Sequence, residues 1–175
     1  LTNAITSSIT TKMYSMGGSE PAIDNLTLGG TSLSITTNGH DIVSTSSSAD
    51  GIKIANSGQT LSITGTLDSS SGNPETTISG FKTAIDNSKG GTVNLTNIEL
   101  NGNTTDIQNE GTLNLNGKNA IGTIADNTNP TGTTNVKSGT SIIDTINQKI
   151  VEIFTGAKLE TETVTASEQV KNAGD

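Results

Sequence analysis

Six aspartates recur at nearly even intervals and are the residues whose type and spacing are best suited to chemistry. The series runs through Asp50, Asp68, Asp86, Asp106, Asp126 and Asp144. If the series shared one corner of a stacked repeat, its carboxylates would lie about 5 Å apart and repel each other unless a cation or turn amides intervened. Carboxylate oxygens are ligands that Ca²⁺ prefers. One prediction is therefore a row of calcium sites at Asp68, Asp86, Asp106 and Asp126, with no other cofactor expected.

The second interpretation of these aspartates is structural, and the residue types favour it. Several of them precede a small polar residue, as in Asp68-Ser69, Asp86-Asn87 and Asp126-Asn127. Such pairs form turns in which the carboxylate accepts hydrogen bonds from nearby backbone N–H groups. The nonapeptide calcium repeat GGxGxD is absent. Local turns thus account for the series without a metal.

A catalytic centre has one candidate, because the chain has no Cys and His40 is its single His. His40 lies in the turn sequence Asn38-Gly39-His40-Asp41, where a solvated histidine is the simpler interpretation. A sugar-cleaving enzyme would use paired carboxylates. Its candidate site would be Asp41 and one member of the aspartate series, together with His40. We expect no catalytic residue and no enzymatic activity, with a glycan-binding or glycan-hydrolysing protein as the alternative.

The composition of the 175 residues excludes several classes of protein. Nine Lys, no Arg and 17 acidic residues give a net charge of −8, so the chain lacks the basic patch that nucleic acids require. No run approaches the roughly 20 apolar residues of a membrane-spanning helix. The absence of Cys excludes disulfides and thiolate metal sites. With 29% hydrophobic and 2% aromatic residues, the chain is either disordered or built around a narrow core.

Internal repeats favour the folded alternative. AIDNLTLGGTSLSI at 22–35 resembles AIDNSKGGTVNL at 84–95, and related copies are GIKIANSGQTLSI at 51–63 and TDIQNEGTLNLNG at 105–117. Each copy ends in alternating apolar residues, a pattern typical of strands: Leu33/Ile35, Leu61/Ile63, Val93/Leu95 and Leu113/Leu115, with Thr134/Val136 as a weaker fifth pair. A repeat of about 20 residues fits one turn of a stacked β-solenoid. We therefore predict an all-β fold, a parallel β-helix with coils of about 20 residues and short helical or irregular caps at the ends.

The ends of the chain depart from the repeat. Leu1, Ile5, Ile9, Met13 and Met16 have helical spacing, and so do Ile143, Ile146, Ile150 and Ile153, although the second set also suits strands. The outward residues between the apolar pairs are Ser or Asn, so the sequence lacks the regular rows of Thr that would order water on an ice-binding surface. Where Asn residues stack, their side chains can form hydrogen-bonded ladders. The predicted organisation is a cap or linker over 1–20, a solenoid over 21–158, and a last strand or polar tail over 159–175.

The strings GGTVNLTNIELNG, NEGTLNLNG and TGTTNVKSGTSI, within roughly 22–140, resemble the passenger region of bacterial autotransporters and related secreted adhesins. The resemblance implies export to the bacterial surface or the extracellular space, as part of a larger protein with a structural or adhesive role. Its expected partners are a host surface protein or glycan, or a second copy of the chain. It also implies a right-handed coil. The composition predicts no nucleic-acid partner, and the apolar runs predict no membrane-spanning segment in this chain.

Overall fold

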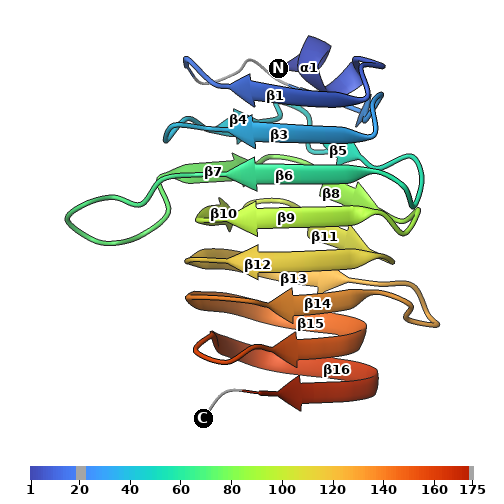
Figure 1. Cartoon of the computed structure of the whole chain (residues 1–175), viewed down its shortest axis with the longest axis vertical. Helices are drawn as coiled ribbons and strands as arrows, with labels where there is room; N and C mark the ends of the chain where they lie inside the picture. Colours follow the sequence, from blue (N-terminus) through green and yellow to red (C-terminus); the bar gives the residue numbers. More distant parts are fainter. Residues whose placement is uncertain (19–22, 174–175) are drawn as a thin grey trace.

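The computed structural model describes residues 1–18 and 23–173. It is a β-solenoid of about 8 turns with about 21 residues per turn, and its strands are parallel (Figure 1). The predicted all-β β-helix is confirmed. The predicted boundary between 1–20 and 21–158, and the last two residues of the predicted tail, lie outside the described residues.

Three stacks of strands form the sides of the solenoid. The front sheet comprises β1 (Thr11–Ser15), β3 (Ser32–Thr36), β6 (Thr60–Thr64), β9 (Thr92–Thr96), β12 (Thr112–Asn116) and β14 (Thr133–Val136). The second stack contains β4 (Ile42–Val43), β7 (Thr76–Ser79) and β10 (Ile98–Leu100), and the third contains β2 (Leu26–Thr27), β5 (Ile52–Lys53), β8 (Thr83–Asn87) and β11 (Thr105–Asn109). Three longer strands continue the stacks: β13 (Asn119–Ala125), β15 (Thr140–Ile153) and β16 (Lys158–Asn172). Strand β13 pairs with both β10 and β11, β15 pairs with β13 and β14, and β16 pairs with β15.

The alternation of apolar and polar residues decides which side chains enter the core. In β6 and β9 the apolar pair points inward and is buried, while the Thr, Ser and Asn between point outward. The strand register then stacks apolar residues on apolar residues: Leu61 lies beside Leu33 in one neighbouring turn and beside Val93 in the other. The weaker pair predicted at Thr134/Val136 is also a strand, β14, and both side chains are buried. A core of Ile, Leu and Val columns thus suffices without aromatic residues in most turns.

The ends differ from each other. Helix α1 (Thr2–Thr6) buries Ala4 and Ile5 over the first turn, which matches the expectation of a short helical cap. The helical spacing that continues to Met16 does not extend the helix, because Thr11–Ser15 forms β1 and pairs with β3. Residues 158–172 form β16, which pairs with β15. Among the described residues, no helix is long and apolar enough to cross a bilayer.

Two ladders of amide side chains run along the solenoid axis, as stacked Asn residues predict. On the outside, Asn114 donates to Asn94 Oδ1 (2.8 Å) and Asn135 donates to Asn114 Oδ1 (3.0 Å). A second, buried ladder runs through Asn87, Asn109 and Gln148. Its side-chain hydrogen bonds are 2.8 and 2.6 Å long. The register of successive turns is therefore specified by polar pairs as well as by apolar columns.

Candidate functional site

The connection between β6 and β7 projects far sideways from the rod as a green loop in Figure 1. It folds as a small hairpin, in which the Leu67 and Pro74 backbones form an antiparallel bridge. Asp68 organises its tip, since Oδ1 accepts hydrogen bonds from the Ser70 N–H (3.1 Å) and Ser71 N–H (2.6 Å). The hydrogen bond from the Ser70 hydroxyl (2.6 Å), together with these backbone bonds, holds the pKa of Asp68 well below its usual range. The loop is thus an ordered projection.

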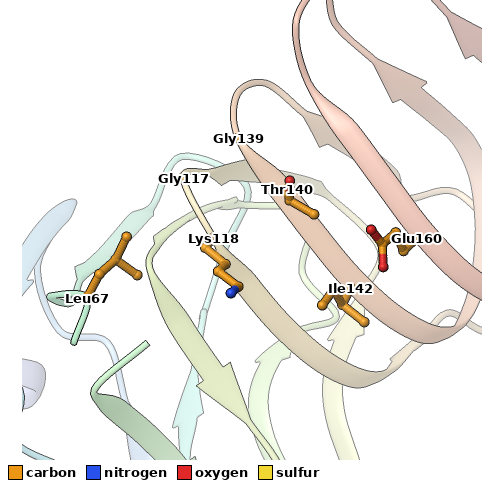
Figure 2. Close-up of a pocket in the computed structure, with 7 residues that line it drawn as sticks. All are labelled: Leu67, Gly117, Lys118, Gly139, Thr140, Ile142 and Glu160. Atoms are coloured by element: carbon orange, nitrogen blue, oxygen red, sulfur yellow. The ribbon is translucent and has the colours of Figure 1, made fainter. Parts of the chain in front are cut away.

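An open groove of about 410 Å³ lies between this loop and the lower turns of the solenoid. Its lining comes from the loop, from two turns and from two strands: Leu67, Gly117, Lys118, Gly139, Thr140, Ile142 and Glu160. Figure 2 shows Leu67 on one side of the opening and Ile142 and Glu160 on the other, with Lys118 between them. A volume of this size is in the range of sites that hold small ligands or short segments of larger ones.

Glycines form the floor of the groove because the turns there require them. Gly117 and Gly139 have φ values of +66° and +68°, the left-handed region that favours glycine. They are also packed on each other, since a Cβ on Gly139 would overlap the Gly117 carbonyl oxygen. Asn97, in the neighbouring turn, is itself left-handed, with a φ of +56°. Its Oδ1 accepts a hydrogen bond from the Lys118 N–H (2.9 Å), so three closely packed turns define this floor.

The groove combines apolar contact surface with opposite charges. Leu67 and Ile142 are 40% and 39% exposed, large values for such side chains, and both face the opening. Lys118 Nζ donates to Asn73 Oδ1 (2.7 Å) and so ties the loop to the solenoid. Glu160 carries the negative charge and pairs with Lys158 (2.6 Å). The arrangement can hold an uncharged or zwitterionic amphipathic group, with its apolar side against Leu67 and Ile142.

The structure does not place Asp68, Asp86, Asp106 and Asp126 at one matching register position, although Asp86 and Asp106 lie on the neighbouring strands β8 and β11. Asp68 lies at the tip of the projecting loop, while Asp86 lies on β8 opposite Lys53 and Gln108 in the neighbouring turns. Asp126 follows β13 and closes a loop by accepting hydrogen bonds from the Thr131 and Gly132 N–H groups (2.9 and 2.7 Å). Within residues 1–18 and 23–173, no three His, Asp or Glu side chains are grouped so that they could hold a metal ion.

Asp86 and Asp106 are the two buried members of the series, and each has its own partners. Asp86 forms an ion pair with Lys53 (3.0 Å), which raises the pKa of Lys53. Burial raises the pKa of Asp86, but hydrogen bonds from Ser88 and Lys53 outweigh it and leave that pKa below its usual value.

Asp106 stabilises a corner of the solenoid. Its Oδ2 accepts hydrogen bonds from the Gly122 and Thr123 N–H groups (2.7 and 2.9 Å), and Asn103 donates to Oδ1 (2.8 Å). Burial dominates these bonds and raises the pKa of Asp106 above its usual value. Turns and corners therefore account for Asp68, Asp86, Asp106 and Asp126, and calcium binding remains a prediction from the sequence alone.

His40 and Asp41 lie at the connection between β3 and β4, apart from the groove-lining residues. The His40 N–H donates to the Thr37 carbonyl (3.0 Å), as in the predicted turn. Asp41 Oδ1 accepts a hydrogen bond from the Thr77 N–H (2.8 Å) and so joins this connection to β7. The contacts of Asp41 are those of a residue that fixes the backbone.

The groove was not predicted from the sequence, although a signal for its loop exists. The apolar pairs begin at Leu61, Val93 and Leu113, so the interval from Leu61 to Val93 is much longer than the interval from Val93 to Leu113. The longer interval contains the projecting loop, because the connection from β6 to β7 is far longer than the one from β9 to β10. Insertions in solenoids frequently carry function. The contact of this loop with turns much later in the chain depends on how the coils stack, and the sequence pattern does not predict that stacking.

Comparison with known proteins adds no assignment: no family model matches the chain, and neither a curated protein nor a solved structure matches it.

Proposed function

We propose that this chain is a non-enzymatic, surface-exposed structural and adhesive segment of a larger secreted bacterial protein, which presents its projecting loop and groove to a host or neighbouring-cell ligand. The observation that carries the proposal is the Leu67 loop, which departs from an otherwise regular rod and forms one wall of an open groove. The rod supplies a rigid support for that loop, which is how many scaffolds present binding residues.

Two further observations support an adhesive role over a polysaccharide-cleaving one. The groove is lined by exposed apolar side chains and backbone, the type of surface that binds without chemistry. The aspartates that suggested catalysis make structural contacts, each with backbone N–H groups or a lysine. The resemblance to autotransporter passengers supports export to the cell surface, the location in which an adhesive rod would act.

We expect the double substitution Leu67→Ser/Ile142→Thr to reduce attachment about tenfold or more, because it removes both apolar contacts of the groove. The measurement uses beads coated with the purified chain, on a glycan array and on cultured epithelial cells. Met13→Ser is the matched control: Met13 is 82% exposed and lies at the other end of the rod.

Equal attachment by the double variant and the Met13→Ser control would exclude the groove as the adhesive site. No attachment of the unmodified chain to either surface would contradict the adhesive function itself. Release of reducing ends from a polysaccharide panel would show that the chain is an enzyme, and the alternative function would then replace the one proposed.

A further inference from the structure

The two charged side chains that line the groove already have partners within the protein. Lys118 Nζ donates to the uncharged Asn73 Oδ1 (2.7 Å), and Glu160 pairs with Lys158 (2.6 Å). Ammonium and carboxylate groups can each form more than one hydrogen bond. An uncharged ligand can therefore use the remaining capacity of both groups, whereas a charged ligand would compete with the contacts that they already make.

The charges around the groove also favour an uncharged ligand. Asp68 follows Leu67 in the loop, and Glu99 lies two register steps from Ile142 in the same column of side chains. Together with the net charge of −8, these carboxylates repel acidic polymers. Lys118 lies between the two apolar walls in Figure 2, so a cationic group that touched both walls would meet its ammonium.

The lining combines apolar contacts with one hydrogen-bond donor and one acceptor. Leu67 and Ile142 supply the apolar contacts, the ammonium of Lys118 only donates, and the carboxylate of Glu160 only accepts. An N-acetylated amino sugar carries the complementary groups close together. Its acetamido methyl group and ring C–H groups are apolar, its acetamido oxygen accepts, and its hydroxyls donate. A sugar without the acetamido group would leave part of the apolar lining without a contact.

The shape of the groove suits the end of a glycan. A volume of about 410 Å³ is near the lower limit of ligand sites, which span roughly 300 to 1,000 Å³, so it admits one or two sugar rings. Gly117 and Gly139 have no side chains, so a flat ring can lie close to the backbone of the floor. A protein partner would instead be anchored by a large side chain in a deep pocket, and this groove is open.

We propose that the groove binds the terminal N-acetylated amino sugar of an uncharged glycan. This inference rests on the adhesive function proposed above and names the ligand of its groove. The acetamido methyl group lies against Leu67 and Ile142, the acetamido oxygen accepts a hydrogen bond from Lys118, and a ring hydroxyl donates to Glu160. One such contact in an open groove is weak, and many rods on one surface make the attachment strong, because each contact raises the effective concentration for the next.

Saturation-transfer NMR on the purified full chain tests this inference with a matched pair of disaccharides. N,N′-diacetylchitobiose and cellobiose share the same rings and linkage, and the second has hydroxyls in place of the acetamido groups. We expect diacetylchitobiose to bind about fivefold or more tightly than cellobiose, because it adds a buried methyl group and a hydrogen bond. The strongest transfer should reach its acetamido methyl protons.

A hyaluronan tetrasaccharide provides the acidic comparison, since it carries the same acetamido sugar next to carboxylates. It should bind more weakly than diacetylchitobiose, because the chain and the groove margin are acidic. Equal or tighter binding of cellobiose would overturn the acetamido contact. Equal or tighter binding of the hyaluronan fragment would overturn the preference for an uncharged glycan.

Variants of the lining place the binding in the groove. Lys118→Met should weaken the binding of diacetylchitobiose about fivefold, and Lys118→Arg should recover part of that loss because it keeps a charged donor. Leu67→Ser should lower the preference for diacetylchitobiose over cellobiose, a readout that a general loss of stability would not move. The matched control is Lys89→Met, at an exposed turn lysine outside the groove lining. Circular dichroism verifies that each variant is folded, and equal binding by Lys118→Met, Leu67→Ser and the control would overturn the inference.

The bead assay separates this inference from the proposed function. Free diacetylchitobiose should inhibit the attachment of coated beads to cells. Attachment that is lost in Leu67→Ser/Ile142→Thr but resists diacetylchitobiose would overturn this inference in favour of a protein or another glycan, and would leave the adhesive function. Binding of diacetylchitobiose in the groove without attachment of beads to any surface would leave this inference and remove the adhesive function.

Discussion

Asn109→Ala should destabilise the chain by about 2 to 5 kcal/mol, because it removes the centre of the buried ladder and leaves both a cavity and unpaired polar groups. The Asn109 side chain is fully buried, and its Nδ2 donates to Gln148 Oε1 (2.6 Å). Its Oδ1 accepts from Asn87 (2.8 Å). After the substitution, Gln148 Oε1 keeps only the longer contact with Thr134 Oγ1 (3.3 Å). Two successive turns thus lose their polar register pair at once.

The matched control is Asn114→Ala, which removes the centre of the outer ladder. Asn114 is half-buried and makes the same type of contact, with Asn94 and Asn135. Because water can replace the lost partners there, its cost should be about 1 kcal/mol or less. Urea unfolding followed by circular dichroism measures both variants. Equal destabilisation of the two would contradict the placement of Asn109 inside the solenoid and Asn114 outside.

Gly139→Ala has the second large expected effect, about 2 to 4 kcal/mol, because it combines an unfavourable φ with a backbone clash. The φ of Gly139 is +68°, and the new Cβ would overlap the Gly117 carbonyl oxygen and lie 2.6 Å from the carbonyl carbon. The two turns must separate to admit it. That movement weakens the hydrogen bond from the Lys158 N–H to the Gly139 carbonyl (2.8 Å) and distorts the floor of the groove.

Gly156→Ala separates the clash from the conformational effect. Gly156 has a similar φ of +77°, but nothing lies within 4 Å of the position that its Cβ would take. Its cost should therefore be that of the left-handed backbone alone, about 1 kcal/mol. Thermal melting compares the two variants, and a difference of about 1 kcal/mol corresponds to roughly 2 to 4 °C in a domain of this size. If both variants melt together, Gly117 and Gly139 are not stacked as described.

The strands were predictable because two local signals agree. In TLSIT and TVNLT, alternate residues are apolar and Gly or Asn follows the segment. A few neighbouring residues are therefore enough to predict which side chains point into the core. Amide residues at matching places, such as Asn94 and Asn114, predict a ladder once the turns stack. Each signal needs only neighbouring residues and an approximate period.

The aspartates do not align in one row, because residues that are evenly spaced in the sequence need not occupy the same position in successive turns of a solenoid. The turns differ in length: Thr60 is much farther from Thr92 in the sequence than Thr92 is from Thr112, yet each pair is in register. A series with nearly constant steps therefore does not keep one register position: Asp86 pairs with Gln108 rather than with Asp106, although both aspartates lie on neighbouring strands. The apolar pairs follow the coil because burial fixes them, whereas a turn aspartate is fixed only by nearby N–H groups.

The groove was missed for a related reason. The groove joins Leu67 to Glu160, two residues that are far apart in the sequence. The groove exists only once the turns are stacked in one register, which depends on all the insertions together.

Distances between pairs of spin labels test that stacking most directly, and the absence of Cys allows labels to be introduced one pair at a time. Thr11 is separated from Thr112, Thr133 and Gln169 by four, five and seven successive register steps. At about 4.8 Å per step, double electron–electron resonance on cysteine variants at these positions should give mean separations near roughly 19, 24 and 34 Å. Distances that rise linearly with the number of steps would establish the solenoid that carries the groove. Broad distributions, or distances that follow sequence separation instead, would contradict it.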